Sequence, residues 1–126
     1  MYRFRKHYTR EEARDLLPQI REWLKHLTQV RKWLDDCDAK VQRLLKEGSD
    51  VGGELASNWV KLAAEFQKLS GQFRQREIFI KDLDRGLIDF PAIIAGREVF
   101  LCWEQDEEDI EFWHELDTGY AGRERL

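Results

Sequence analysis

Long apolar stretches are missing from this sequence of 126 residues. No run of about 18 apolar residues occurs, so no segment is expected to span a membrane as a helix. The basic N-terminus is not followed by the apolar stretch of a secretory signal, and the chain has only two cysteines, Cys37 and Cys102. Both lie at apolar-periodic positions, which indicates buried, reduced thiols in a cytoplasmic protein rather than a disulfide framework.

Common catalytic and metal-binding motifs are also absent. The sequence has no GxSxG, no HExxH and no CxxC. Neither cysteine lies in a recognisable Cys/His arrangement, so nucleophilic catalysis has no support. Enzymatic activity of another kind is left open.

Basic charge is too weak and too scattered for a nucleic-acid partner. The net charge is −4, and residues 104–126 hold nine acidic side chains against two basic ones. Residues 1–47 carry 12 basic against eight acidic side chains. The two ends are therefore expected to attract each other, within one chain or between two, and no nucleic acid is predicted to bind.

Apolar residues recur at intervals of three and four over residues 9–47, which predicts one long helix. Thr9 and Glu12 form the pattern of a capping box at its start. Pro18 falls on the face away from the apolar positions, so a kink is expected there rather than an end. The apolar positions are Ala13, Leu16, Ile20, Trp23, Leu27, Val30, Leu34, Cys37, Val41 and Leu44.

A second helix is predicted over residues 54–76, after a loop that contains Gly52 and Gly53. A short loop between two apolar-periodic helices indicates an antiparallel hairpin. The second helix is shorter and leaves the apolar residues between Leu16 and Leu24 uncovered. This mismatch predicts a homodimer, in which the long helix of a second copy covers them.

The period changes after residue 76 and predicts a small antiparallel sheet. Four short strands are expected, over residues 78–80, 86–90, 98–103 and 110–113. The fold class is therefore α+β, a long antiparallel helical hairpin followed by a four-stranded sheet. Residues 1–126 are expected to form one domain, with the hairpin in 9–76 and the sheet and tail in 77–126.

Several separated segments resemble the family of unknown function DUF2203. These segments are YTREEARDLLP, DVGG, IKDLDRGLIDFPA, GREVFLCW and FWHELDTGYAGR. The resemblance covers nearly the whole chain, and it implies a small bacterial-type cytosolic protein without an established activity.

Three residues of the predicted sheet form a candidate site for a divalent metal: Asp82, Asp89 and His114. The turn at residues 84–86 brings the first two strands together, and alternation places His114 on the same face as Ile110 and Phe112. A histidine beside carboxylates on a buried face can bind a metal or act as an acid–base group. The alternative is turn and ion-pair carboxylates with a histidine that is hydrogen-bonded inside the sheet.

Three arginines next to glycines form a candidate anion site: Arg85, Arg97 and Arg123. Guanidinium groups and nearby backbone N–H groups are suited to anions, although turn arginines also pair with carboxylates.

Two function classes follow from the sequence. The first is a non-enzymatic interaction or scaffold protein that self-associates through the long helix. The second is a metal- or small-anion-binding protein whose site lies where the turns of the sheet meet the hairpin.

Overall fold

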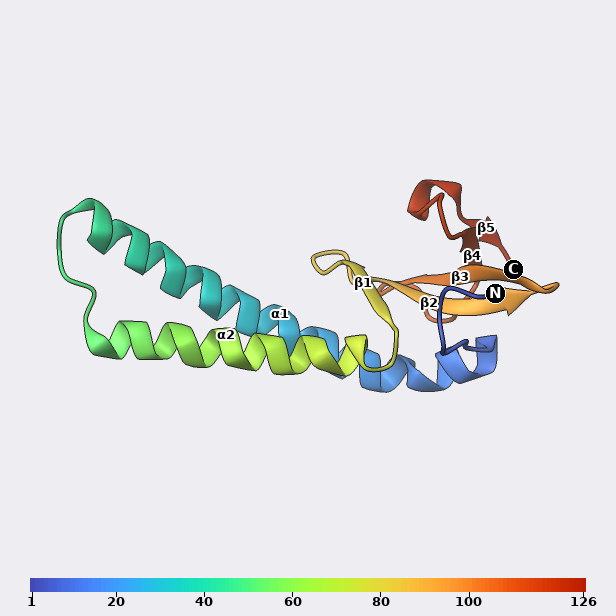
Figure 1. Ribbon diagram of the computed structural model, residues 1–126, viewed down its shortest axis with the longest axis horizontal. Coiled ribbons are helices and arrows are strands. Elements are labelled where there is room, and N and C mark those ends of the chain that lie inside the picture. The colour runs from blue at the N-terminus through green and yellow to red at the C-terminus, as the bar shows by residue number, and fades with distance from the viewer. The chain divides into compact units, whose positions relative to one another are not determined.

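The computed structural model describes residues 1–126 and has the α+β composition expected from the sequence (Figure 1). Two long helices come first, and a sheet of five strands follows. A 3-10 turn, η1 (Tyr120–Gly122), precedes the last strand. The elements are α1 (Arg10–Lys46), α2 (Gly53–Arg74), β1 (Phe79–Asp82), β2 (Leu87–Ile94), β3 (Arg97–Glu104), β4 (Phe112–Glu115) and β5 (Glu124–Arg125).

The start of α1 is held by the predicted capping box. The backbone N–H of Glu12 donates to Thr9 Oγ1 at 3.1 Å, and the N–H of Thr9 donates to Glu12 Oε1 at 3.0 Å. The helix continues through Pro18 for 37 residues, as predicted. Neither α1 nor α2 contains a segment long and apolar enough to cross a lipid bilayer.

The sheet is an antiparallel meander with the strand order β1-β2-β3-β4-β5. The prediction of four strands was wrong because β5, a pair of charged residues alongside β4, has no apolar alternation to reveal it. Strand β2 also extends past residue 90, through Pro91. Proline has no N–H to donate to a neighbouring strand. On the β1 side none is needed, because β1 pairs with β2 only as far as Asp89. The carbonyl of Pro91 instead accepts a hydrogen bond from the N–H of Tyr8 at 2.7 Å.

A two-residue turn sets the register between β2 and β3. Ala95 and Gly96 both have positive φ, 50° and 78°, which is typical of a type I′ hairpin turn. Pairing begins at Ile94 and Arg97 on either side of the turn, places Asp89 opposite Cys102, and runs back to Leu87 opposite Glu104. Because side chains alternate along a strand, this register decides which residues share a face.

The chain divides into two compact units, residues 1–24 with 72–126 and residues 25–71. The division crosses both helices: the first turns of α1 and the last residues of α2 belong to the same unit as the sheet.

In the first unit, one face of the sheet packs on the beginning of α1 (Figure 1). The ring of Tyr8 contacts Phe90, and the Arg21 guanidinium lies 4.9 Å from the Trp103 ring. This packing leaves Leu17, Ile20 and Leu24 only 3%, 0% and 2% exposed. The prediction that the apolar residues between Leu16 and Leu24 are left uncovered within one chain was therefore wrong: the sheet covers them together with the end of α2, where Phe73 contacts Trp23.

In the second unit, α1 and α2 run antiparallel. The Cys37 thiol donates to the carbonyl of Leu55 at 3.7 Å, and His26 lies 3.9 Å from Glu65. Burial falls toward the loop between the helices. We call residues 31–66 the distal hairpin. Three of its large apolar side chains, Leu45, Trp59 and Val60, are 57%, 39% and 59% exposed.

Candidate functional site

The face of the sheet that does not pack on α1 carries buried polar side chains. Asp89 on β2 lies directly opposite Cys102 on β3, and His114 on β4 lies opposite Phe100. Asp89 and His114 are 1% and 2% exposed, and Cys102 is fully buried. We call Asp89, Cys102 and His114 the donor cluster. Their ligand atoms all lie within 4.8 Å of one another.

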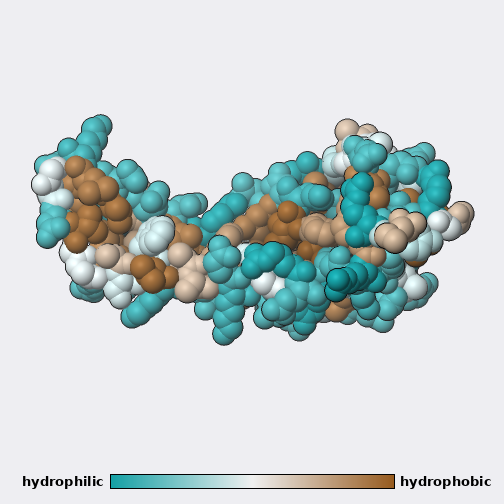
Figure 2. Space-filling model, in the orientation of Figure 1, coloured by the Kyte–Doolittle hydropathy of each residue, from teal (hydrophilic) through white to brown (hydrophobic).

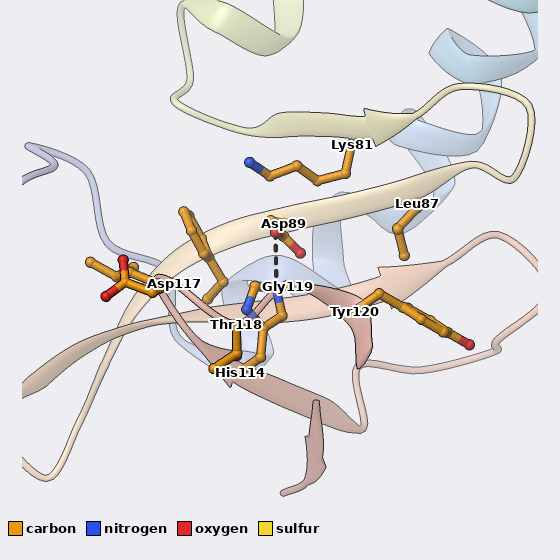
Figure 3. A pocket seen from close by; sticks show the side chains of 10 residues that line it. Lys81, Leu87, Asp89, His114, Asp117, Thr118, Gly119 and Tyr120 are labelled. Atoms are coloured by element: carbon orange, nitrogen blue, oxygen red, sulfur yellow. Dashed lines mark hydrogen bonds and ion pairs between the residues drawn. The ribbon is translucent and has the colours of Figure 1, made fainter. Parts of the chain in front are cut away.

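Both nitrogens of the His114 ring have an acceptor. Nε2 lies 3.0 Å from Asp89 Oδ2 (Figure 3). Nδ1 lies 2.6 Å from the carbonyl of Glu115. An imidazole donates from both nitrogens only when it is protonated. Burial opposes that charge, but hydrogen bonds to Asp89, Cys102 and Glu115 and the charge of Asp89 outweigh it and raise the pKa of His114 to about 10. His114 and Asp89 therefore form a buried ion pair at neutral pH.

Asp89 uses only half of its hydrogen-bonding capacity. Its Oδ2 meets His114, whereas Oδ1 is buried and has no hydrogen-bond partner. Buried polar atoms in folded proteins are almost always paired, since an unpaired one costs about 1–3 kcal/mol. The free oxygen therefore marks a place where an additional ligand would be favourable.

A cavity of about 300 Å³ adjoins the donor cluster (Figure 3). Asp89 and His114 form part of its wall, and Lys81 and Tyr120 lie at its border. The segment after β4 closes another side with Thr118 and Gly119. A space of this size holds water or a small ligand, so the donor cluster is buried within the protein but not sealed from a cavity.

The geometry does not match a catalytic Cys-His-Asp triad. A triad needs the thiol on one ring nitrogen and the carboxylate on the other. In this protein Asp89 contacts Nε2, while Nδ1 is occupied by a backbone carbonyl. The arrangement suits binding at Nε2 rather than transfer of a proton through the ring.

A family model described as Uncharacterized conserved protein (DUF2203) matches residues 6–126. The chain belongs to the DUF2203 family. This match confirms the resemblance seen in the sequence motifs. No curated protein and no solved structure matches the chain. The whole donor cluster lies inside the region that matches the DUF2203 model.

Of the three metal ligands predicted from the sequence, the DUF2203 structure brings together Asp89 and His114 but not Asp82. Asp82 Oδ1 accepts a hydrogen bond from the backbone N–H of Arg85 at 3.2 Å, as a turn residue. Cys102 completes the donor cluster instead. Sequence reasoning treated Cys102 only as a buried thiol. Counting back from a two-residue turn at Ala95-Gly96 would have placed it opposite Asp89.

The three predicted anion-binding arginines are each paired with a glutamate in this DUF2203 chain. Arg85 lies 2.7 Å from Glu104, Arg123 lies 2.7 Å from Glu107, and Arg97 pairs with Glu115. Arg85 and Arg123 also lie over the Tyr120 ring, at 4.2 and 4.3 Å. The contacts of Arg85 and Arg123 hold η1 beside the cavity, and each of the three guanidinium groups already has a carboxylate partner.

The basic start of α1 and the acidic segment after β3 contact each other within one chain. Arg14 donates to Asp109 through two hydrogen bonds of 2.8 and 3.0 Å, and Arg10 lies 3.5 Å from the same carboxylate. Arg21 donates to the carbonyls of Gln105 and Glu107. The acidic segment is therefore bound by α1, which was one of the two arrangements that the sequence left open.

The buried ion pair predicts that stability decreases with rising pH. Below pH 6.5 His114 is protonated both folded and unfolded, so the full stabilisation is present. As the pH rises toward about 10, the unfolded state loses its proton first, and the unfolding free energy should fall by a few kcal/mol. Urea unfolding of protein stripped of metal by a chelator, at fixed salt, measures this fall.

His114→Gln is the control for that measurement, since glutamine can still donate to Asp89 but does not titrate. Besides Asp89, the charged groups beside His114 are Lys81 and Asp117, which line the same cavity. The variant should show a flatter pH profile over this range. If the unfolding free energy falls equally with pH in both proteins, the pH dependence does not come from His114.

Proposed function

We propose that this protein is a non-enzymatic scaffold or interaction protein that forms a homodimer through the distal hairpin. The observation that carries the proposal is the fall in burial of apolar side chains of the two helices toward the loop that joins them. Leu27 and Val30 are each 1% exposed, whereas Trp59 and Val60 in the distal hairpin are 39% and 59% exposed. Exposed apolar residues grouped in this way are typical of an association surface.

The exposed residues surround a groove. A cavity of about 290 Å³ is lined by apolar side chains and one acidic residue: Asp38, Val41, Val51, Ala56, Trp59 and Val60. Figure 2 shows the apolar atoms gathered at the loop end of the two helices. Half-buried Leu34 and Phe66 continue the same apolar pattern away from the loop. The groove is therefore one end of a longer apolar surface.

A second copy of the chain suits this surface better than an unrelated partner. Both helices keep heptad spacing, so two distal hairpins can join into a four-helix bundle with one shared core. Residues 25–71 hold eight basic and seven acidic side chains, so two copies do not repel each other strongly. A two-fold axis would bring the same patch of each copy together, as in most homodimers.

The proposal includes a cytosolic location and no membrane or nucleic-acid partner. Cys37 and Cys102 are both buried free thiols, a form that persists in a reducing compartment. The pairing of the arginines with glutamates gives no support to the alternative of small-anion binding.

Sedimentation velocity at micromolar concentration tests the proposal. The wild-type protein should sediment with twice the monomer mass of 15.1 kDa. Val60→Glu should sediment as a monomer with an unchanged circular dichroism spectrum, because Val60 is exposed in the single chain and tolerates charge there. The desolvation of glutamate opposes association only if Val60 lies in the interface.

Ile93→Glu is the matched control, since Ile93 on β2 is also exposed, at 41%, but lies in the other unit. It should leave the dimer intact. A monomeric wild type, or a Val60→Glu variant that dimerises as the wild type does, would overturn the proposed association.

A further inference from the structure

The donor cluster presents one nitrogen, one sulfur and one oxygen donor from three adjacent strands. All three side chains are buried, and the ligand atoms lie within 4.8 Å of one another. Around a tetrahedral metal with bonds of about 2.0–2.3 Å, neighbouring donor atoms lie roughly 3.3–3.8 Å apart. Small changes of side-chain torsion bring the three donors to that spacing, because all three already point to the same place.

The hydrogen bond at Nδ1 gives His114 the orientation of a metal ligand. A ligating histidine typically donates its second N–H to a carbonyl or carboxylate, which selects the tautomer and directs the other nitrogen to the metal. Here Nδ1 lies 2.6 Å from the carbonyl of Glu115, and Nε2 is turned toward Asp89 and Cys102. The backbone of β4 thus holds the ring in position.

The unpaired Oδ1 of Asp89 is an independent indication of a missing ligand. This oxygen is buried and has no hydrogen-bond partner, and Asp89 is one of the residues that line the cavity. A simple buried ion pair with His114 explains only Oδ2. A cation bound to Asp89 would offset the cost of burying the second oxygen.

We propose that Asp89, Cys102 and His114 bind one zinc ion, with a fourth position open toward the cavity at Lys81 and Tyr120. This inference is separate from the proposed dimer, because the donor cluster and the distal hairpin belong to different units. Zinc accepts sulfur, nitrogen and carboxylate ligands in a tetrahedron, whereas calcium and magnesium require mainly oxygen. An open fourth position is typical of zinc sites that bind water or a substrate.

Charge balance also suits a divalent ion. Bound to zinc, the thiolate of Cys102 and the carboxylate of Asp89 together offset the two positive charges of the ion, while His114 binds as a neutral imidazole. The bound cluster is therefore neutral, which avoids leaving an uncompensated charge away from water. Arg123, 3.9 Å from Cys102 Sγ, keeps its own partner Glu107 at 2.7 Å.

Metal titration of the full-length protein, purified without an affinity tag and stripped with a chelator, tests this proposal. Isothermal calorimetry with zinc should give one ion per chain. Cobalt(II) as a second probe should produce a thiolate-to-metal absorption band together with the visible bands of a tetrahedral ion. Cys102→Ser, a nearly isosteric change, should abolish the thiolate band and weaken zinc binding by more than about 100-fold, beyond the usual effect of losing an outer-shell partner.

Two matched controls distinguish the site from adventitious binding. Cys37→Ser removes the other buried thiol, and Asp82→Asn removes the carboxylate that caps the turn; both variants should bind zinc like the wild type. Asp89→Asn should bind weakly, as Cys102→Ser does. Absence of stoichiometric zinc binding by the wild type, unchanged binding by Cys102→Ser, or equal losses in the two cysteine variants would overturn the proposal.

Discussion

Replacing Asp89 with alanine should lower the unfolding free energy of the metal-free protein by about 3–5 kcal/mol. Asp89 and His114 are 1% and 2% exposed and lie 3.0 Å apart. Removing the carboxylate leaves the imidazole buried without its counter-charge, so it must either stay charged in an apolar site or lose its proton. The loss should be measured by urea unfolding near neutral pH in the presence of a chelator.

Asp82→Ala is the matched control for this prediction. Asp82 makes a single hydrogen bond to the N–H of Arg85 in a turn, so its removal should cost no more than about 1 kcal/mol. Replacing both members of the ion pair, Asp89→Leu with His114→Leu, should cost less than Asp89→Leu alone, because no charge remains buried. Equal losses for Asp89→Ala and Asp82→Ala would mean that the buried pair contributes little to stability.

Trp103→Ala should destabilise the protein by about 3–5 kcal/mol. The Trp103 side chain is fully buried on the face of the sheet that packs on α1. Its Nε1–H donates to the carbonyl of Glu107 at 2.9 Å, and Arg21 covers the ring. Alanine would leave a large cavity between sheet and helix and would remove one of the two hydrogen bonds to the Glu107 carbonyl, which also accepts from Arg21, so two costs add to each other.

Trp103→Phe separates the two costs, since phenylalanine fills most of the cavity but cannot donate to Glu107. Trp103→Phe should lower the unfolding free energy clearly less than Trp103→Ala does. Ile93→Ala, at a position that is 41% exposed on the neighbouring strand, should change the unfolding free energy least of the three. A loss below about 1 kcal/mol for Trp103→Ala would contradict its place in the core.

The two helices and most of the strands could be predicted because their signals are local. The capping box of Thr9 and Glu12 and the heptad spacing of α1 depend only on residues within one or two turns. Strand β5 had no such signal, since two charged residues adopt an extended structure only through their pairing with β4. The continuation of β2 through Pro91 likewise depends on β1 ending its pairing at Asp89.

The candidate site was only partly accessible from the sequence. Side-chain alternation correctly turned His114 inward, and its proximity to Asp89 follows from the order of the strands. Asp82 was included because the turn at residues 84–86 was expected to bring it close to Asp89, yet its carboxylate turns back to Arg85. Cys102 was overlooked because its neighbours Leu101 and Trp103 made the whole strand look uniformly apolar.

The amino-acid sequence by itself determined the long helices, the turns and the apolar faces of this DUF2203 protein, because periodicity and capping arise between residues that are neighbours along the chain. The tertiary structure decided what covers each face. It placed the sheet over Leu17 to Leu24, left the distal hairpin exposed, and aligned Asp89, Cys102 and His114 across three strands. Those outcomes depend on strand register and on contacts between residues tens of positions apart, for which local sequence patterns carry no signal.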